Sequence, residues 1–293
     1  MFIDLSDRAK LRVTGPDRIR FLNGQLTHDL SRLDPGFSVY ACALSAKGKL
    51  CGDLFVTPLA DAILLDYEPV LRESLAARLE KYLVADEVEI EDVTEQFALF
   101  HVCDLVLPDA ILPEATIAVN DRFAIAGKDI LVPAALNSVV LKLVNEKPLT
   151  DSALEQFRIE QGIPRWGFEL SEGVIPNEAG LDERAISYTK GCYLGQEIIS
   201  RIKSLGHVNR HLQGVLLKNE AKLEIGDRLI AEGGKEIGSV TSACQSDRLH
   251  ASIGLAYLKR GFDQAGAIYS VLRPATSSLI GSAEVRSLPF VQS

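Results

Sequence analysis

The sequence has few cysteines, and no two of them lie close together. Five cysteines are scattered over 293 residues without a C-x-x-C pair. Small secreted proteins depend on dense cysteine frameworks, and closely spaced cysteine pairs are typical of structural zinc sites. The spacing therefore argues against a disulfide framework and favours a reducing compartment. The five residues are Cys42, Cys51, Cys103, Cys192 and Cys244.

The sequence also lacks an excess of positive charge and any long apolar run. Lys and Arg number 31 against 40 Asp and Glu, so the net charge is -9. A protein that grips nucleic acid through its phosphates needs a basic surface, and a membrane span needs about 20 apolar residues in succession. The first ten residues contain neither an apolar signal core nor an Arg-rich leader. We expect no membrane association, no direct nucleic-acid partner and a cytoplasmic location.

Strand and helix patterns predict an α+β region over the first half of the chain. Two apolar runs at 38–45 and 50–57 flank the segment AKGK, which predicts a β-hairpin with glycine in its turn. Leucines at every fourth position predict a helix over 69–84. Further strands are expected near 87–91, 97–103, 122–126 and 129–132.

The second half of the chain predicts a helix, a long connection and a region of short strands. The helix is expected over 151–161, because Gly162 and Pro164 end it. Residues 163–187 are rich in Gly, Pro and Asn, and loops of that length are uncommon unless they are functional. From about His211 onward, short apolar runs alternate with glycine-containing turns, which predicts a small all-β barrel or sandwich.

One octapeptide, residues 190–197, surrounds a thiol with polar groups. Its sequence is KGCYLGQE, so Cys192 lies between Lys190 and the pair Gln196 and Glu197. A nearby cation favours the reactive thiolate form of cysteine, and glycines let the backbone approach a ligand closely. A free cysteine also packs as a small buried hydrophobe, but such a cysteine needs no polar neighbours. We predict that Cys192 is functional, with Lys190 favouring the thiolate and Gln196 and Glu197 positioning the thiol or its partner.

The octapeptide resembles the K-G-C-Y-x-G-Q-E signature of the YgfZ family. Members of that family are folate-binding proteins related to the aminomethyltransferase, or T-protein, of the glycine cleavage system. Arg201 and Gly206 match the continuation of the signature, and similar segments extend over nearly the whole chain. These segments are Gly15-x-Asp17, FLNGQ at 21–25, THD at 27–29, KGK at 47–49, RIEQGIP at 158–164, IPNE at 175–178 and GSVTS at 238–242.

The resemblance implies an α+β fold of the aminomethyltransferase type. In that fold, three domains form a ring, the middle domain is ferredoxin-like, and the C-terminal domain is a small β-barrel. The implied domains are a discontinuous folate-binding domain at 1–48 plus 146–208, a ferredoxin-like domain at 49–145, and the barrel at 209–293. The apolar patterns described above agree with the last two domains.

The resemblance also implies a bound tetrahydrofolate and candidate contacts for it. Asp53 interrupts an apolar strand, where Asp is disfavoured, and the T-protein resemblance places the catalytic carboxylate there; the alternative is a solvent-facing position. Arg158 either clamps the folate glutamate carboxylate or pairs with Glu155 or Asp151. Glu178 either binds the pterin edge or caps a turn.

Tyr193 and Arg201 complete the predicted folate contacts. Because Trp166 is the only tryptophan, tyrosine and phenylalanine must supply any surface that stacks on the pterin. The residues expected to do so are Tyr40, Phe55, Tyr188 and Tyr193.

The family resemblance implies an accessory protein that uses folate and Cys192 in the assembly or repair of iron–sulfur clusters in selected enzymes. Its partners would be folate, iron–sulfur enzymes or cluster-assembly proteins, and its link to tRNA modification would be indirect. One alternative is an aminomethyltransferase-like one-carbon transferase with Asp53 as the key carboxylate, although the glycine-rich T-protein block before the last domain is missing. Another is a folate-binding sensor or scaffold. Cys42 and Cys51, expected across the hairpin from each other, would be packed thiols rather than metal ligands.

Overall fold

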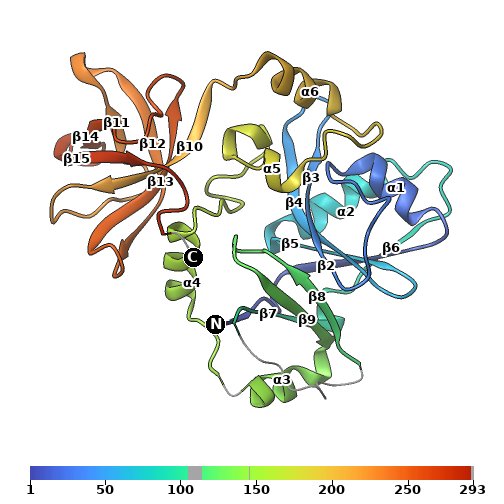
Figure 1. Cartoon of the computed structure of the whole chain (residues 1–293). Helices are drawn as coiled ribbons and strands as arrows, with labels where there is room; N and C mark the ends of the chain where they lie inside the picture. Colours follow the sequence, from blue (N-terminus) through green and yellow to red (C-terminus); the bar gives the residue numbers. More distant parts are fainter. Residues whose placement is uncertain (105–113, 145, 292–293) are drawn as a thin grey trace. The chain divides into compact units, whose positions relative to one another are not determined.

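The computed structural model describes residues 1–104, 114–144 and 146–291. The chain folds into two compact units (Figure 1). The first unit contains Met1–Thr150 and Asp182–Ser200, and the second contains Asp151–Leu181 and Arg201–Ser293. The 190–197 segment therefore belongs to the first unit, while the C-terminal strands belong to the second. The three domain ranges expected from the sequence stay a prediction.

The first unit is built around a five-stranded antiparallel sheet with the strand order β3-β4-β5-β2-β6. The predicted hairpin is confirmed as its β3–β4 pair. A Cβ atom at Gly52 would lie 3.2 Å from Leu71 and 3.4 Å from Leu75, so the glycine lets the segment that includes helix α2 (Arg72–Glu80) pack closely on β4. The strands are β2 (Ala9–Thr14), β3 (Val39–Leu44), β4 (Leu50–Pro58), β5 (Ile63–Tyr67) and β6 (Glu89–Asp92).

Helices of the first unit are short. The helix expected over 69–84 begins as a 3-10 turn at Pro69–Leu71, continues as α2 (Arg72–Glu80) and gives way to turns at Lys81. Its leucines Leu75 and Leu79 are buried, as their spacing predicts. The remaining helices of this unit are α1 (Arg18–Gln25), α3 (Asn137–Val144), α5 (Asp182–Ala185) and the 3-10 turns Thr94–Gln96 and Ala134–Leu136, and α6 (Gln196–Leu205) continues into the second unit.

A second antiparallel sheet in this unit has the order β1-β7-β9-β8. Its strands are β1 (Phe2–Asp4), β7 (Phe97–Val102), β8 (Thr116–Asn120) and β9 (Gly127–Pro133). Buried side chains such as Phe2, Phe100 and Ile130 pack with Val140 and Val144 of α3.

The strand expected at 122–126 is wrong. The strand lies earlier, at β8, and residues 121–126 form the turn that leads into β9. The Arg122 backbone N–H donates to the Asn120 side chain at 3.1 Å, and Ala124 adopts a positive φ of 58°. Phe123 of this turn is buried with its ring 5.5 Å from that of His101, so it contributes to packing rather than to a β-ladder.

The second unit contains α4 (Asp151–Glu160), the 3-10 turn Pro176–Ala179 and a closed six-stranded barrel. The barrel order is β10-β13-β12-β11-β14-β15, and its interior is filled by apolar side chains such as Val215, Leu229, Ile237 and Val285. The predicted C-terminal β-barrel is thus confirmed. Its strands are β10 (Arg210–Leu217), β11 (Arg228–Ile230), β12 (Glu236–Ser246), β13 (Ala251–Lys259), β14 (Ile268–Arg273) and β15 (Ser278–Arg286), with a 3-10 turn at Glu232–Gly234.

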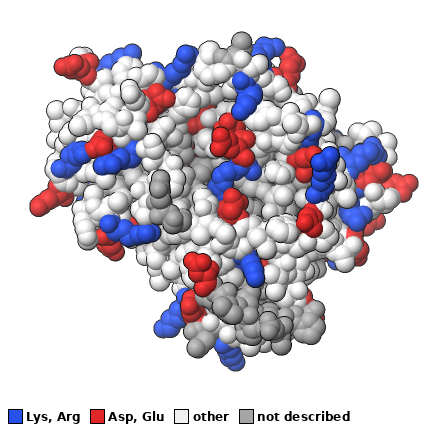
Figure 2. Space-filling model, viewed as in Figure 1, with Lys and Arg blue, Asp and Glu red and all other residues white. Residues whose placement is uncertain are grey.

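Two surface properties follow from the described residues. None of the helices among them is long and apolar enough to cross a membrane. Figure 2 shows Lys and Arg interspersed with Asp and Glu over the face in view, and the basic side chains drawn there do not merge into one patch.

Candidate functional site

Asp53 lies in the middle of β4 and is almost fully buried. Its Oδ2 atom accepts a hydrogen bond of 2.9 Å from the Tyr40 hydroxyl on the neighbouring strand. Its Oδ1 atom is buried and has no hydrogen-bond partner among the residues that the structure describes. Burial raises the pKa of Asp53 to about 6, although the charge of Arg8 opposes the shift. A buried carboxylate oxygen without a donor is costly, so this atom marks a place where a ligand group would be stabilised.

The strand register places Cys42, rather than Cys51, directly opposite Asp53. The turn already sets Leu44 opposite Leu50, and an irregularity between Ala43 and Leu44 shifts the register by one more residue, so the expected cross-strand pair of cysteines does not form. Burial, followed by the charge of Asp53, raises the pKa of the Cys42 thiol well above its usual value. The described residues contain no group of three His, Cys, Asp or Glu side chains that could hold a metal ion.

Aromatic rings and guanidinium groups flank Asp53. The rings of Tyr40 and Phe55 lie 4.8 Å apart, centre to centre. Arg122 stacks on Phe55 at 3.8 Å from the ring centre, and Arg184 lies 5.6 Å from the centre of the Tyr40 ring. The predicted stacking residues Tyr40 and Phe55 therefore lie next to the carboxylate. Each of the two rings is also close to a guanidinium group of the same unit.

Arg122, which stacks on Phe55, belongs to a buried ion network that the sequence did not predict. Arg122 donates to both carboxylate oxygens of Asp66 at 2.9 and 3.0 Å and also to Asp129. His101 contacts Asp129 through Nδ1 at 2.7 Å. Burial alone would raise the pKa of Asp129, but Arg122 and His101 outweigh it and lower the pKa to about 2. The signal was available, because Asp66 and Asp129 interrupt apolar strands in the way that singled out Asp53.

Lys190 is buried and fixes the segment that carries Cys192. Its ammonium donates to the backbone carbonyls of Asn23, Leu26 and His28 at 2.7, 2.8 and 2.6 Å. Burial lowers the pKa of Lys190 to about 8. These three bonds use all three N–H groups of an ammonium, so Lys190 ties the end of α1 to the 190–197 segment. Its predicted effect on the Cys192 thiolate would have to act through space, without a hydrogen bond.

Neighbouring residues of the 190–197 segment face different environments. Cys192 is exposed, whereas Tyr193 is buried with its ring 5.2 Å from the Lys190 ammonium. Burial, followed by the nearby Tyr188 and Cys42 groups, raises the pKa of Tyr193. The Tyr193 phenol is thus within electrostatic reach of Cys42, the residue opposite Asp53. The segment therefore presents its thiol to solvent and buries its tyrosine.

The start of α6 is fitted against the β3–β4 turn. Gly195 has a φ of 88°, and a Cβ atom there would lie 2.7 Å from the Ser45 carbonyl oxygen. A Cβ atom at Gly48 would lie 2.8 Å from the Ile198 side chain. Both glycines are therefore required for the close approach. Gln196 donates weakly to the Gly191 carbonyl at 3.5 Å, and Glu197 is exposed.

Thr27 joins the Asp53 strands to the chain that leads into the octapeptide. Its hydroxyl donates to the Ala185 carbonyl at 2.6 Å and accepts from the Cys42 N–H at 2.8 Å. Its backbone carbonyl accepts from the Ser187 N–H at 3.0 Å. Asp53 and Cys192 therefore belong to one hydrogen-bonded framework within the first unit.

Replacing Lys190 with methionine is expected to lower the free energy of unfolding by about 2 kcal/mol, because three buried or partly buried carbonyls lose a charged donor. Urea unfolding at pH 7 measures this difference. Exposed Lys47 provides the matched control, since Lys47→Met should change the free energy by less than about 0.5 kcal/mol. Equal, small effects of both changes would contradict the anchoring role. The rate at which iodoacetamide alkylates Cys192 in Lys190→Met separately tests the predicted influence on the thiolate.

Arg158 lies in the second unit, where protein groups accept all five of its N–H donors. Nε and one terminal nitrogen bind Glu155 at 3.0 and 2.5 Å, and the remaining donors bind Ile163 O, Glu169 and Ser242 at 2.6 to 3.0 Å. The geometry favours the ion pair with Glu155 over the folate clamp, because no N–H group remains for a ligand carboxylate. Arg158 is therefore not among the proposed folate contacts.

Glu178 and Arg201 also fall in the second unit. The Oε2 atom of Glu178 accepts from Arg210 at 3.0 and 3.1 Å and from its own turn at Ile175 N–H, at 3.4 Å. Arg210 in turn lies 4.2 Å from the centre of the Tyr257 ring. Arg201 is exposed on α6. The predicted residues thus divide into Asp53, Lys190, Cys192, Tyr193, Gln196 and Glu197 in the first unit and Arg158, Glu178 and Arg201 in the second.

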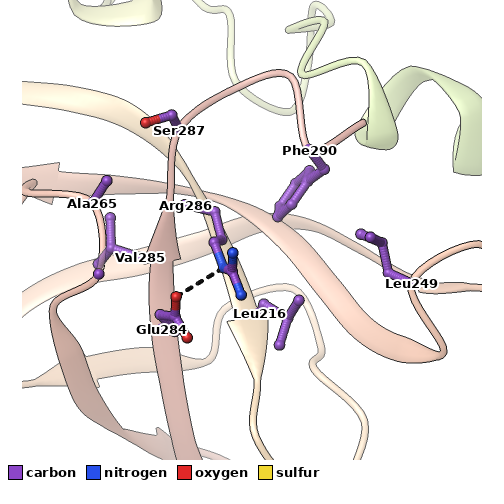
Figure 3. A pocket seen from close by; sticks show the side chains of 9 residues that line it. Leu216, Leu249, Ala265, Glu284, Val285, Arg286, Ser287 and Phe290 are labelled. Carbon is purple, nitrogen blue, oxygen red and sulfur yellow. Dashed lines mark ion pairs between the residues drawn. The ribbon is translucent and has the colours of Figure 1, made fainter. Parts of the chain in front are cut away.

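A pocket of about 460 Å³ lies on the barrel and contains none of the predicted residues. Figure 3 shows Leu216, Leu249 and Phe290 along its wall, with Arg286 paired to Glu284. The Arg286–Glu284 distance is 3.0 Å. Because its charged groups already pair with each other, this pocket offers no unsatisfied group comparable to Asp53.

Comparison with known proteins places this architecture among the aminomethyltransferases. Residues 1–103 match the GCVT N-terminal domain family, and residues 210–292 match the glycine cleavage T-protein C-terminal barrel domain family. The solved structure of aminomethyltransferase T from Bartonella henselae covers 99% of this chain and 86% of its own, with a TM-score of 0.86 and 20% identity. The predicted α+β fold of the aminomethyltransferase type is confirmed.

Proteins with similar sequences indicate a narrower family than the fold does. A YgfZ protein of Yersinia pestis, named as tRNA-modifying, is 27% identical over 98% of this chain and 92% of its own length. A mitochondrial iron–sulfur cluster assembly factor of Dictyostelium discoideum is 26% identical over 73% of this chain. A chloroplastic protein of Arabidopsis thaliana, named for an unproven transferase activity, is 32% identical over 88% of this chain. The matches span 62% and 65% of the last two proteins' lengths.

The fold and the two domain matches define a protein of the aminomethyltransferase superfamily. Within it, the chain belongs to the YgfZ-type family.

Proposed function

We propose that this protein binds tetrahydrofolate and supports the assembly or repair of iron–sulfur clusters in selected enzymes, with Cys192 as its reactive group. The observation that carries the proposal is the pairing of two features in one unit: a buried carboxylate with an unsatisfied oxygen, and an exposed thiol on a firmly anchored segment. The names of relatives, a cluster assembly factor and a tRNA-modifying protein, support the same role. Support of tRNA modification would be indirect, through client enzymes that carry clusters.

The residues around Asp53 fit a folate. Asp53 Oδ1 lacks a donor, and the pterin ring offers N–H groups that would satisfy it. Tyr40 and Phe55 would contribute aromatic surface, and the Tyr40 hydroxyl holds the carboxylate in place through the other oxygen. Bound tetrahydrofolate would supply a carrier of one-carbon units. Tyr193 remains a further proposed contact within the first unit, and the contacts expected for Glu178 and Arg201 stay predictions.

Cys192 is suited to brief covalent contact with a partner because it is exposed and its segment is fixed. Attack of its thiolate on the outer sulfur of a partner's persulfide would transfer that sulfur to Cys192 and return the partner's cysteine as a thiolate. Ligation of a cluster iron and a mixed disulfide are the other two roles open to this thiol. Each requires a protein partner, either an iron–sulfur enzyme or a cluster-assembly protein.

The proposed partners exclude nucleic acid and membrane. A net charge of -9 and the mixed charges in Figure 2 favour protein and small-molecule partners over phosphate backbones. A cytoplasmic location is part of the same proposal.

Calorimetric titration with tetrahydrofolate tests the folate part of the proposal. The protein and its Cys192→Ala variant are expected to bind with equal affinity, because the thiol lies on the exposed side of its segment. Absence of binding to the unmodified protein would overturn the folate role. A large loss of affinity in Cys192→Ala would show that the thiol belongs to the folate site.

A second candidate function is one-carbon transfer from folate, with Asp53 as the acid or base. The pKa of about 6 at Asp53 favours this candidate, since proton transfer at neutral pH is most efficient for a group that titrates nearby. Incubation with methylene-tetrahydrofolate and an amine donor or a lipoyl protein would reveal turnover. Turnover that is lost in Asp53→Asn and retained in Cys192→Ser would favour transfer over the cluster role.

A further inference from the structure

Arg184 is a second residue next to Tyr40 with an unsatisfied polar atom. It lies on α5, its guanidinium is 5.6 Å from the centre of the Tyr40 ring, and one terminal nitrogen donates to the Asp121 and Arg122 carbonyls at 2.8 and 3.4 Å. Its Nε atom is buried and, within the described part of the chain, has no acceptor. The hydrogen bonds to the turn at 121–122 hold the guanidinium beside the ring.

Tyr40 therefore lies close to two residues whose unsatisfied groups are of opposite kind. Asp53 Oδ1 needs a donor, and Arg184 Nε needs an acceptor. Arginine stays protonated and has no acceptor of its own, so its N–H can pair only with an acceptor. A ligand that satisfies both groups must carry a donor for Asp53 and an acceptor for Arg184. A cyclic amide has that pattern, and the 4-oxo form of a pterin contains one.

We infer that Arg184 is a specificity residue that selects 4-oxo pterins over 4-amino pterins. The inference rests on the folate binding proposed above. Replacing the C4 carbonyl with an amino group puts a donor where Arg184 requires an acceptor. The buried Nε–H group of Arg184 would then stay unpaired and would lie against an N–H group of the ligand. Sites built around a hydrogen bond reject analogues that cannot make it more strongly than apolar sites reject a change of size.

The test compares tetrahydrofolate with its 4-amino counterpart, in which an amino group replaces the C4 carbonyl and N3 carries no hydrogen. The unmodified protein is expected to bind the 4-oxo form about 10- to 100-fold more tightly. In Arg184→Met this ratio should fall at least threefold, and the preference that remains comes from the N3–H, which the 4-amino compound does not offer to Asp53. Arg32→Met is the matched control, because Arg32 is exposed, and it should keep the original ratio.

The outcomes separate the two proposals. If neither compound binds the unmodified protein, the folate function fails and the inference fails with it. If tetrahydrofolate binds but the unmodified protein does not prefer it, or the affinity ratio is unchanged in Arg184→Met, the inference alone fails. Arg184→Leu, which also removes the Nε donor, replaces the methionine variant if thermal melting shows that the latter is unfolded.

Discussion

Changing Cys192 to serine is expected to abolish rescue of cluster-dependent enzyme activity in a strain that lacks this gene. Serine keeps the size of the side chain but removes the thiolate, and every role proposed for this position needs sulfur. Because Cys192 is exposed and makes no contribution to the core, the variant should fold and melt like the unmodified protein. Activity of an iron–sulfur enzyme in extracts of the complemented strains is the measurement.

Cys244→Ser provides the control for Cys192→Ser. Cys244 is half-buried on the barrel, and burial raises the pKa of its thiol to about 12, so it is poorly suited to reaction. This variant should rescue fully. Full rescue by Cys192→Ser as well would mean that the thiol mechanism is wrong, and the folate site alone would then have to explain the function.

Changing Asp53 to asparagine is expected to have two effects of opposite sign. Tetrahydrofolate affinity should fall about 100-fold, because the charged acceptor is lost and an amide donor can take the place of Oδ1. Stability at pH 8 should rise by roughly 3 kcal/mol, since burial of the carboxylate raises its pKa to about 6 from the ordinary value of about 3.9. A residue retained at a cost in stability is typical of a binding or catalytic site.

The pH dependence identifies the origin of this stability difference. With the raised pKa, the carboxyl group is protonated in the folded protein below about pH 6 but in the unfolded chain only below about pH 4. The penalty is therefore fully present above pH 6 and disappears as the pH falls to 4. Urea unfolding at pH 4 and pH 8 measures it, and Asp61→Asn, at an exposed carboxylate, should show no such difference. A gain that persists at pH 4 would contradict the assigned cause.

Local sequence patterns predicted much of the fold. The hairpin over β3 and β4, the buried leucines of α2 and the short strands of the barrel all follow from periodicity and from turn residues. The strand expected at 122–126 failed because Arg122 is fixed by two carboxylates from other strands. Such long-range pairing overrides local propensity and leaves no periodic signal.

The candidate site was predictable in part for the same reason. Asp53 and Cys192 stood out because each contrasts with its neighbours in the sequence. Arg158 looked equally suitable for folate, but its five donors are used by groups as distant in sequence as Ser242, which no local pattern reveals. Arg184 went unnoticed because its importance depends only on its position beside Tyr40.

The bonds around Thr27 have a consequence for the length of the chain. Three points within six residues are pinned: the Ala185 carbonyl and the Ser187 N–H to Thr27, and the Lys190 ammonium to the carbonyls near the end of α1. The segment 185–190, which leads to Cys192, is therefore fixed at both ends and cannot change its length freely. An extra residue between Ala185 and Lys190 would break at least one of these attachments, even with every side chain kept, so the count of residues here is as much a requirement as their identity.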